Sequence, residues 1–314
     1  MHDGSAWRKA KQIHVHDGSA WRDVKKAYIH DGSAWRQVFQ KEGSWVQIGS
    51  IGLEAGPNKM LRFNNQLYVV SGGNVHVWNG SSFSQVGSLG TVTALKATAA
   101  WLFVLSAGAV YRWDGSSWVL YGNAHYYSDI TGPDNVVNVQ RVFYVQGPTY
   151  FYSLKNGVEG FIGGWVAVPS VGEIPRSSTY GYGKSSGHLY AFYDNGTVVG
   201  SFFSMPANTI CITDTGVNVF AISSAGVYRC ADNGSFTLVY NTDTPATIRY
   251  NPDTAFSPVL LTTTNFKVKQ ADGFGSTWTD ISSTTPFSGT MGEACVVGGI
   301  LYAGCTNGIY QWVP

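Results

Sequence analysis

Two histidines near the start of the chain have the spacing of a pair of metal ligands. His14 and His16 alternate with Val15, and alternate side chains of a strand point to the same face. Imidazoles in that arrangement can hold a transition metal. The surrounding sequence is repeated, however, and its other copies do not repeat the first of the two histidines. The sequence therefore predicts no metal site.

Carboxylates that could act as acids, bases or nucleophiles are dispersed along the chain. Four of them lie in predicted hairpin turns: Asp114, Asp194, Asp232 and Asp272. An aspartate in such a turn stabilises the bend by bonding to its own backbone. The segments at 113–118 and 270–278 resemble the Asp-box turns of sialidase-like propellers, but the chain lacks the arginine cluster and the Tyr/Glu nucleophile pair of those enzymes. We expect a protein that is not an enzyme, with no catalytic residues and no cofactor.

Cysteine spacing and net charge exclude further classes of protein. Cys211, Cys230, Cys295 and Cys305 lack the spacing of metal ligands and are predicted to be small buried apolar residues. The chain has 20 Lys and Arg against 19 Asp and Glu, so a nucleic-acid partner is not expected. Apolar runs are no longer than a strand, which predicts neither membrane insertion nor a secretory signal.

The N-terminal part of the chain contains a perfect heptapeptide repeat. HDGSAWR stands at residues 2–8, 16–22 and 30–36. Asp-Gly between β-forming runs indicates a hairpin with a type I′ turn, so residues 2–40 are predicted to form a β-meander. In each unit a histidine and a tryptophan flank the turn, and we expect their rings to stack, with arginine over a ring or paired with the aspartate of the next unit. The structural repeat residues are His2, Asp3, Trp7, His16, Asp17, Trp21, His30, Asp31 and Trp35.

The repeat segment is too small to enclose a core. One sheet of three or four short strands leaves its apolar face in water. It must pack on the body of its own chain or wrap with other copies around a shared axis.

A looser repeat follows from about residue 43. Hairpins with a polar glycine turn recur, and their anchor residues are spaced by 35 to 43 residues. Such periods predict a seven-bladed β-propeller. A further strand lies ahead of most hairpins, and we take these strands to be the inner strands of the blades. The anchors are Val75, Val110, Phe151, Leu189, Val227, Phe266 and Ile309.

The last copy, GIYQWVP at 308–314, lacks its outer strand, and EGSWVQIGSIG at 42–52 matches the outer strands of other copies. We therefore predict that residues 43–50 close the last blade, because shared strands hide an exposed edge. The predicted domains are an attachment and oligomerisation segment at 1–41 and an all-β propeller at 42–314, in which 42–50 form the closing outer strand.

Aromatic residues among polar ones in the longer loops are candidates for receptor binding. Such residues give contact area at low entropic cost to a sugar face or a protein epitope. The candidates are His125, Tyr126, Tyr127, Trp165, Tyr180 and Tyr182. The same residues could also serve only to keep a β protein soluble.

The units at residues 7–36 resemble the short repeats of bacteriophage tail-fibre and tail-tip proteins. The resemblance covers about the first 40 residues. It implies a virion tail protein that is made in the host cytoplasm. Such a protein attaches to other phage tail proteins through its N-terminus and presents a distal receptor-binding domain, usually as a homotrimer. The expected function is binding of a host-surface glycan or protein through the propeller. The alternative is a structural tail or capsid decoration protein that binds only other virion proteins.

Overall fold

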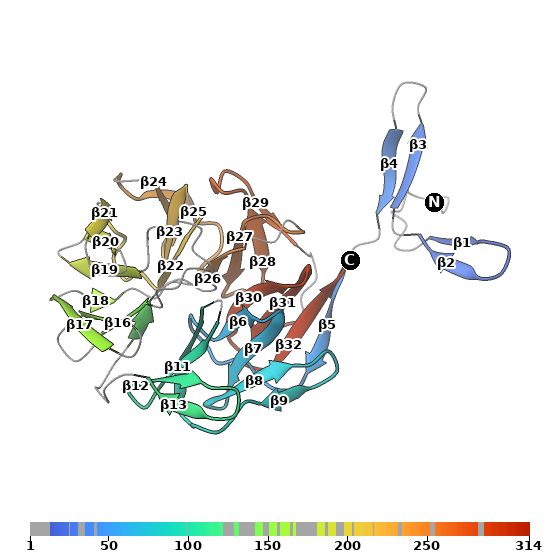
Figure 1. The fold of residues 1–314 in the computed structure, drawn as a ribbon. Coiled ribbons are helices and arrows are strands. Elements are labelled where there is room, and N and C mark those ends of the chain that lie inside the picture. Colours follow the sequence, from blue (N-terminus) through green and yellow to red (C-terminus); the bar gives the residue numbers. More distant parts are fainter. Residues whose placement is uncertain are drawn as a thin grey trace. The chain divides into compact units, whose positions relative to one another are not determined.

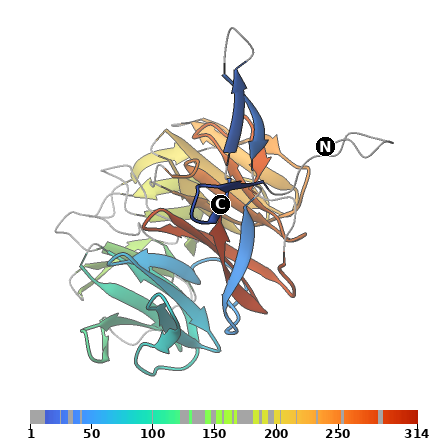
Figure 2. The same ribbon diagram turned by 90° about the vertical axis from the view of Figure 1, so that its right-hand side faces the viewer.

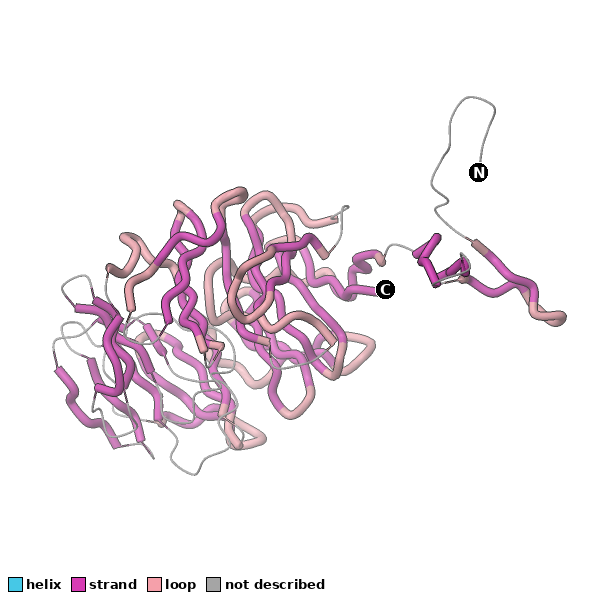
Figure 3. The backbone as a smooth tube through the Cα atoms, turned by 90° about the horizontal axis from the view of Figure 1, so that it is seen from above, coloured by secondary structure: helices cyan, strands magenta, loops and turns pink. Residues whose placement is uncertain are grey.

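A computed structural model gives the fold of the chain. It describes residues 13–314 apart from 25, 31–34, 41–42, 99, 122–128, 132–141, 147–150, 156–157, 164–165, 168–180, 186–187, 193–197, 203, 216, 232–233, 252–254 and 282–285. The described residues form strands β1 to β32 with turns and loops between them (Figure 3), which confirms the all-β prediction. Within the described part, no helix could span a membrane.

The chain divides into two compact units. One consists of Met1–Trp45 with Trp312–Pro314, and the other of Val46–Gln311. The first unit holds the heptapeptide repeats and the second holds most of the looser repeats.

The repeat unit contains two separate hairpins. β1 (His14–His16) pairs with β2 (Trp21–Asp23), and β3 (Lys26–His30) pairs with β4 (Trp35–Gln40). The predicted meander is therefore wrong for this region, because β2 and β3 belong to different sheets. Among the described residues, each of these strands pairs across its own short loop, where closure of the chain costs least entropy.

Four-stranded antiparallel sheets make up the second unit (Figure 1), and in the first six the strands are paired in chain order. The first six are β6 (Met60–Phe63), β7 (Gln66–Ser71), β8 (Asn74–Trp78) and β9 (Phe83–Gln85); β10 (Val92–Ala97), β11 (Leu102–Ser106), β12 (Ala109–Trp113) and β13 (Trp118–Leu120); β14 (Asp129–Thr131), β15 (Val142–Gln146), β16 (Phe151–Lys155) and β17 (Val158–Gly163); β18 (Val166–Ala167), β19 (Gly181–Ser185), β20 (His188–Phe192) and β21 (Val198–Phe202); β22 (Cys211–Asp214), β23 (Asn218–Ser223), β24 (Gly226–Ala231) and β25 (Thr237–Tyr240); β26 (Pro245–Tyr250), β27 (Val259–Thr263), β28 (Val268–Ala271) and β29 (Trp278–Asp280).

The seventh sheet combines strands from both ends of the sequence. Its order is β30 (Met291–Val297), β31 (Ile300–Cys305), β32 (Gly308–Val313) and then β5 (Ser44–Gly49), and Figure 2 shows the light-blue β5 beside the red β32. Trp45 of β5 contacts Trp312 of β32 with ring centroids 5.3 Å apart. The prediction that an N-terminal strand closes the last blade is confirmed, and the fold is a β-propeller.

The innermost strands differ from those predicted. First strands of successive sheets contact one another, as in β6 with β10 and β30, and β26 with β22 and β30. The strands predicted as inner, such as 66–72 and 101–107, are the second strands of their sheets. Charged residues interrupt most of the true first strands, as Arg62 does in β6 and Glu293 in β30, and this hid them from a search for apolar runs.

The hairpin anchors were placed correctly with one exception. Six of them lie in third strands: Val75, Val110, Phe151, Leu189, Val227 and Ile309. Phe266 lies instead in the turn before β28, with a φ of 65°. In that sheet the sequence pattern therefore assigned a turn residue to a strand.

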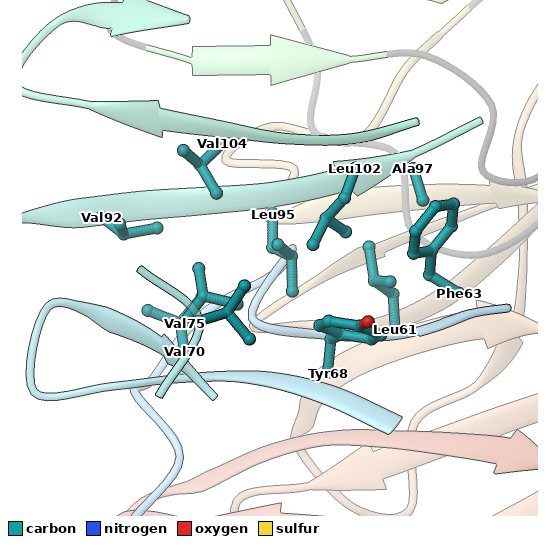
Figure 4. Close-up of a cluster of buried hydrophobic side chains, with 11 residues drawn as sticks. Leu61, Phe63, Tyr68, Val70, Val75, Val92, Leu95, Ala97, Leu102 and Val104 are labelled. Atoms are coloured by element: carbon teal, nitrogen blue, oxygen red, sulfur yellow. The ribbon is translucent and has the colours of Figure 1, made fainter. Parts of the chain in front are cut away.

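The core lies between neighbouring sheets. In Figure 4, Leu61, Tyr68 and Val70 of the first sheet face Leu95 and Val104 of the second. All of these side chains are buried. Leu61 and Leu95 come from first strands, and the other three come from second strands that are buried along nearly their whole length, as expected for sheets covered on both faces.

Aromatic residues of one outer hairpin also contact the outer strand of the preceding sheet. Trp118 donates its indole N–H to the carbonyl of Val86 at 2.8 Å. A Cβ on Gly87 would lie 2.8 Å from the rings of Trp113 and Trp118. Glycine is needed at residue 87 because its φ is 62° and the next sheet's aromatic pair leaves no space for a side chain.

Candidate functional site

The predicted receptor-binding residues fall almost entirely outside the described part of the chain. Five of them do so: His125, Tyr126, Tyr127, Trp165 and Tyr180. The sixth, Tyr182, was expected in a loop, and this is wrong, because it lies in β19 opposite Ala191. The flanking Gly181 and Gly183 favour a loop when read locally, but hydrogen bonding to β20 holds the segment in the sheet.

The middle heptapeptide forms a rigid four-residue loop between β1 and β2. The carboxylate Oδ1 of Asp17 accepts hydrogen bonds from the backbone N–H groups of Ser19 and Ala20, each at 2.9 Å. Only Gly18, with a φ of 96°, has a positive φ in this loop. The predicted type I′ turn is therefore wrong, because the aspartate side chain closes a different turn.

The ring and charge contacts of this unit are local. His16 and Trp21 make an edge-to-face contact with centroids 5.1 Å apart, rather than a parallel stack. Arg22 pairs with Asp17 of its own unit. The predicted partner in the next unit lies outside the described residues, so that expectation is not tested. Hydrogen bonds from Arg22, then Ser19 and Ala20, hold the pKa of Asp17 well below its usual range. The corresponding residues of the first unit, and Asp31, lie outside the described residues.

The same loop recurs in the propeller. Asn79 accepts from the N–H groups of Ser81 and Ser82, and Asp114 accepts from those of Ser116 and Ser117. Gly80 and Gly115 have φ values of 98° and 105°, close to that of Gly18. Aromatic pairs flank both loops, at Trp78 with Phe83 and Trp113 with Trp118. HDGSAW, WNGSSF and WDGSSW are therefore one hairpin motif, which a comparison of residue classes in the sequence could have found.

A buried charged cluster joins the first strands of three sheets. Glu293 of β30 is 0% exposed and accepts from Arg249 of β26 at 2.7 Å. The same carboxylate accepts from the backbone N–H groups of Lys59 and Met60, at 3.3 and 3.1 Å. Arg249 also donates to the carbonyl of Met60. Glu293 lies in a β-bulge of β30, a feature that can redirect a side chain out of the normal alternation.

Lys59 extends this cluster to the second sheet. Its ammonium group donates to the Glu54 carboxylate at 3.3 Å and to the carbonyl of Thr93, a bulge residue of β10. Lys96 of β10 and Asp214 of β22 are also fully buried. Sequence reasoning missed all of these residues, because a charged side chain is expected on the surface unless its buried partner is known.

A second network of titratable groups lies between β25 and the sheet β26–β29. Asp243 accepts from Lys267 at 3.0 Å, from Asn265 at 2.6 Å and from Tyr240, while Lys269 pairs with Asp243 and Asp280. Burial acts to raise the pKa of Asp243, but hydrogen bonds from Tyr240, Asn265 and the two lysines hold it well below its usual range. Burial and then the Asp243 contact raise the pKa of Tyr240 to about 12.

The remaining reactive side chains are held in unreactive surroundings. All four cysteines are buried, as predicted, and none of them is in a disulfide. Burial raises the pKa of Cys211 to about 12, so its sulfur stays protonated at neutral pH. Among the described residues, no three His, Cys, Asp or Glu side chains are grouped in a way that could hold a metal ion. The charge pairs of the buried cluster, such as Arg249 with Glu293, fix strands of neighbouring sheets relative to one another.

Comparison with known proteins identifies the fold alone. No family model matches the chain, and no curated protein matches it. Similar solved structures include BBS1N in complex with ARL6DN (TM-score 0.65, 13% identity, covering 87% of this chain and 98% of that one) and the Pan2 WD40 domain of Neurospora crassa (0.61, 10%, 86% and 95%). A third is PorZ, a surface component of the type-IX secretion system of Porphyromonas gingivalis (0.59, 12%, 86% and 38%). At these identities the likeness extends to the propeller and not to function.

Proposed function

We propose that this chain is a phage tail-fibre protein whose repeats attach to other tail proteins and whose propeller binds a host-surface receptor. The observation that carries the proposal is the joining of HDGSAWR hairpins, which resemble tail-fibre repeats, to a closed propeller. The hairpin of β1 and β2 leaves Trp21 72% and Val15 54% exposed. Exposed apolar side chains on so small a sheet favour attachment to another protein surface.

A trimer would give such a fibre its adhesion. Three propellers on one fibre turn weak single contacts into firm attachment, because the second and third contacts form at a high effective concentration. Weighing the full chain and a chain without residues 1–41 by light scattering tests this. A trimer that becomes a monomer supports it, and equal oligomeric states contradict it.

Adsorption to cells tests the receptor role. Full-length protein with a fluorescent label is added to host bacteria with and without an excess of intact phage particles. Saturable binding that the particles compete away, and that in turn reduces phage adsorption, is expected. Absence of binding by a folded trimer would contradict the proposal and favour the alternative, a structural tail or capsid protein that binds only virion proteins.

A further inference from the structure

We propose that the loop between β28 and β29, together with residues of the sheet β22–β25, is a docking surface for a protein that presents an apolar side chain next to a carboxylate. We name it the Phe274 surface, and it consists of Val217, Asn218, Arg229, Gly273 and Phe274. The inference rests on the proposed function, because it states which part of the propeller meets the receptor and what chemistry the receptor has.

Two apolar side chains of this surface are exposed. Val217 is 57% exposed and Phe274 is 54% exposed, the two highest values for large apolar residues in the described part of the propeller. The two sheets that carry them are neighbours in Figure 1, and β22 and β23 contact β26. A neighbouring pair of exposed apolar residues is more informative than single ones, which are normal on any surface.

The loop that carries Phe274 is held by hydrogen bonds among its own residues. The Asp272 carboxylate accepts from the N–H groups of Phe274 and Ser276 at 3.1 and 2.9 Å. Gly275 has a φ of 64°, and a Cβ there would lie 2.8 Å from the buried ring of Phe220. Because the glycine packs directly against a core residue, the loop has little freedom to move.

The neighbouring sheet also fixes this loop. Asn218 donates its side-chain N–H to the carbonyl of Gly273 at 2.9 Å, and Arg229 donates to the carbonyl of Phe274 at 2.7 Å. The first of these bonds places Val217, which precedes Asn218, beside the loop. The backbone on both sides of Phe274 is thus fixed by hydrogen bonds while its side chain is exposed to solvent. An aromatic side chain positioned in this way loses little entropy on binding, which is typical of residues that dominate an interface.

The charge on this surface indicates the occupant. Arg229 uses one N–H group for the Phe274 carbonyl and forms no ion pair with any described residue. Its other N–H groups can bind a carboxylate, for which the guanidinium geometry is well suited. Val217 precedes Asn218, which bonds to the same loop, and adds a second exposed apolar side chain that fits an apolar side chain of a protein better than the flat face of a sugar. A single cation is too few to hold the protein on an anionic membrane, which is bound by clusters of Lys and Arg.

Arrayed peptides test the proposal. The probe is a set of synthetic 10-residue peptides with one leucine or phenylalanine one to four positions from a glutamate, and a matched set with glutamine. Full-length protein is expected to bind the best glutamate peptides about tenfold more strongly than their glutamine partners. F274S is expected to weaken this binding about tenfold or more, and R229Q to remove the preference for glutamate.

Control variants distinguish binding at the Phe274 surface from non-specific binding to exposed apolar residues. V119S changes an apolar residue of β13 that is 42% exposed and should leave binding unchanged. R229K keeps the charge and should retain part of the preference. Equal binding of the peptides by the original protein and by F274S would overturn the proposal. It would also be overturned if the original protein bound glycans in place of peptides and F274S did not. Self-association of the original protein that is lost in F274S would overturn it as well.

The outcomes also distinguish this inference from the proposed function. If F274S still adsorbs to host cells and competes with phage, the receptor role stands and the Phe274 surface is wrong. If the peptides bind as expected while the full chain does not adsorb to cells, the surface stands with a partner inside the virion.

Discussion

Glu293 shows what a single buried carboxylate does in this fold. It binds Arg249 from one neighbouring sheet and two backbone N–H groups from the other. Removing one partner of a buried ion pair leaves the other charge uncompensated, at a cost of about 3–5 kcal/mol. We expect E293L to lower the free energy of unfolding in urea by that amount.

The paired replacement is the control for this prediction. E293L with R249L removes both charges, so the double variant should be more stable than the sum of the two single effects implies. Strictly additive losses would contradict a direct coupling between the two side chains.

Asp243 makes stability depend on acid pH. Its pKa in the folded protein lies below the value of about 3.9 for an unfolded chain, so its charge stabilises the fold above pH of about 4. That contribution is lost as the pH falls below this value and the carboxylate takes up a proton. D243N should therefore flatten the decline in unfolding free energy between neutral pH and pH of about 3. Parallel declines in the two proteins would show that Asp243 is not responsible.

At the scale of the element, the Asx-Gly-Ser loop determines where each outer hairpin turns. Asp114 bonds to the N–H groups of Ser116 and Ser117, and Asn79 does the same in the preceding sheet. D114A should therefore speed hydrogen exchange at Ser116 and Ser117 several-fold, whereas D114N should leave it close to the original rate. An equal effect of both variants would mean that charge, and not the acceptor oxygen, holds the loop.

At the scale of the whole molecule, β5 decides whether the ring of sheets is complete. Trp45 is 8% exposed and packs on Trp312, so losing it costs about 3–5 kcal/mol. A chain without residues 1–50 should therefore melt at a Tm lower by about 10 °C, by calorimetry. A chain without residues 1–41 keeps β5 and should melt as the full chain does. Equal Tm values for the two truncated chains would contradict the closing role of β5.

Local sequence signals determined much of this architecture. Asp-Gly and Asn-Gly located the hairpins, the spacing of their apolar anchors indicated the propeller, and EGSWVQIG in residues 42–49 identified the closing strand. These features depend on residues close together in the chain, or on a pattern that repeats, and both can be read without coordinates.

Tertiary structure alone decided the innermost strands and their charges. Lys59, Arg249 and Glu293 are up to 234 residues apart in hydrogen-bonded pairs, and each charged side chain taken by itself is expected on the surface. A charge can be buried only when its partner is close, and these partners meet only after the sheets have assembled. The rigid exposure of Phe274 likewise depends on Asn218 and Arg229 of a different sheet. Such contacts leave no local pattern, because their stabilisation exists only in the folded protein.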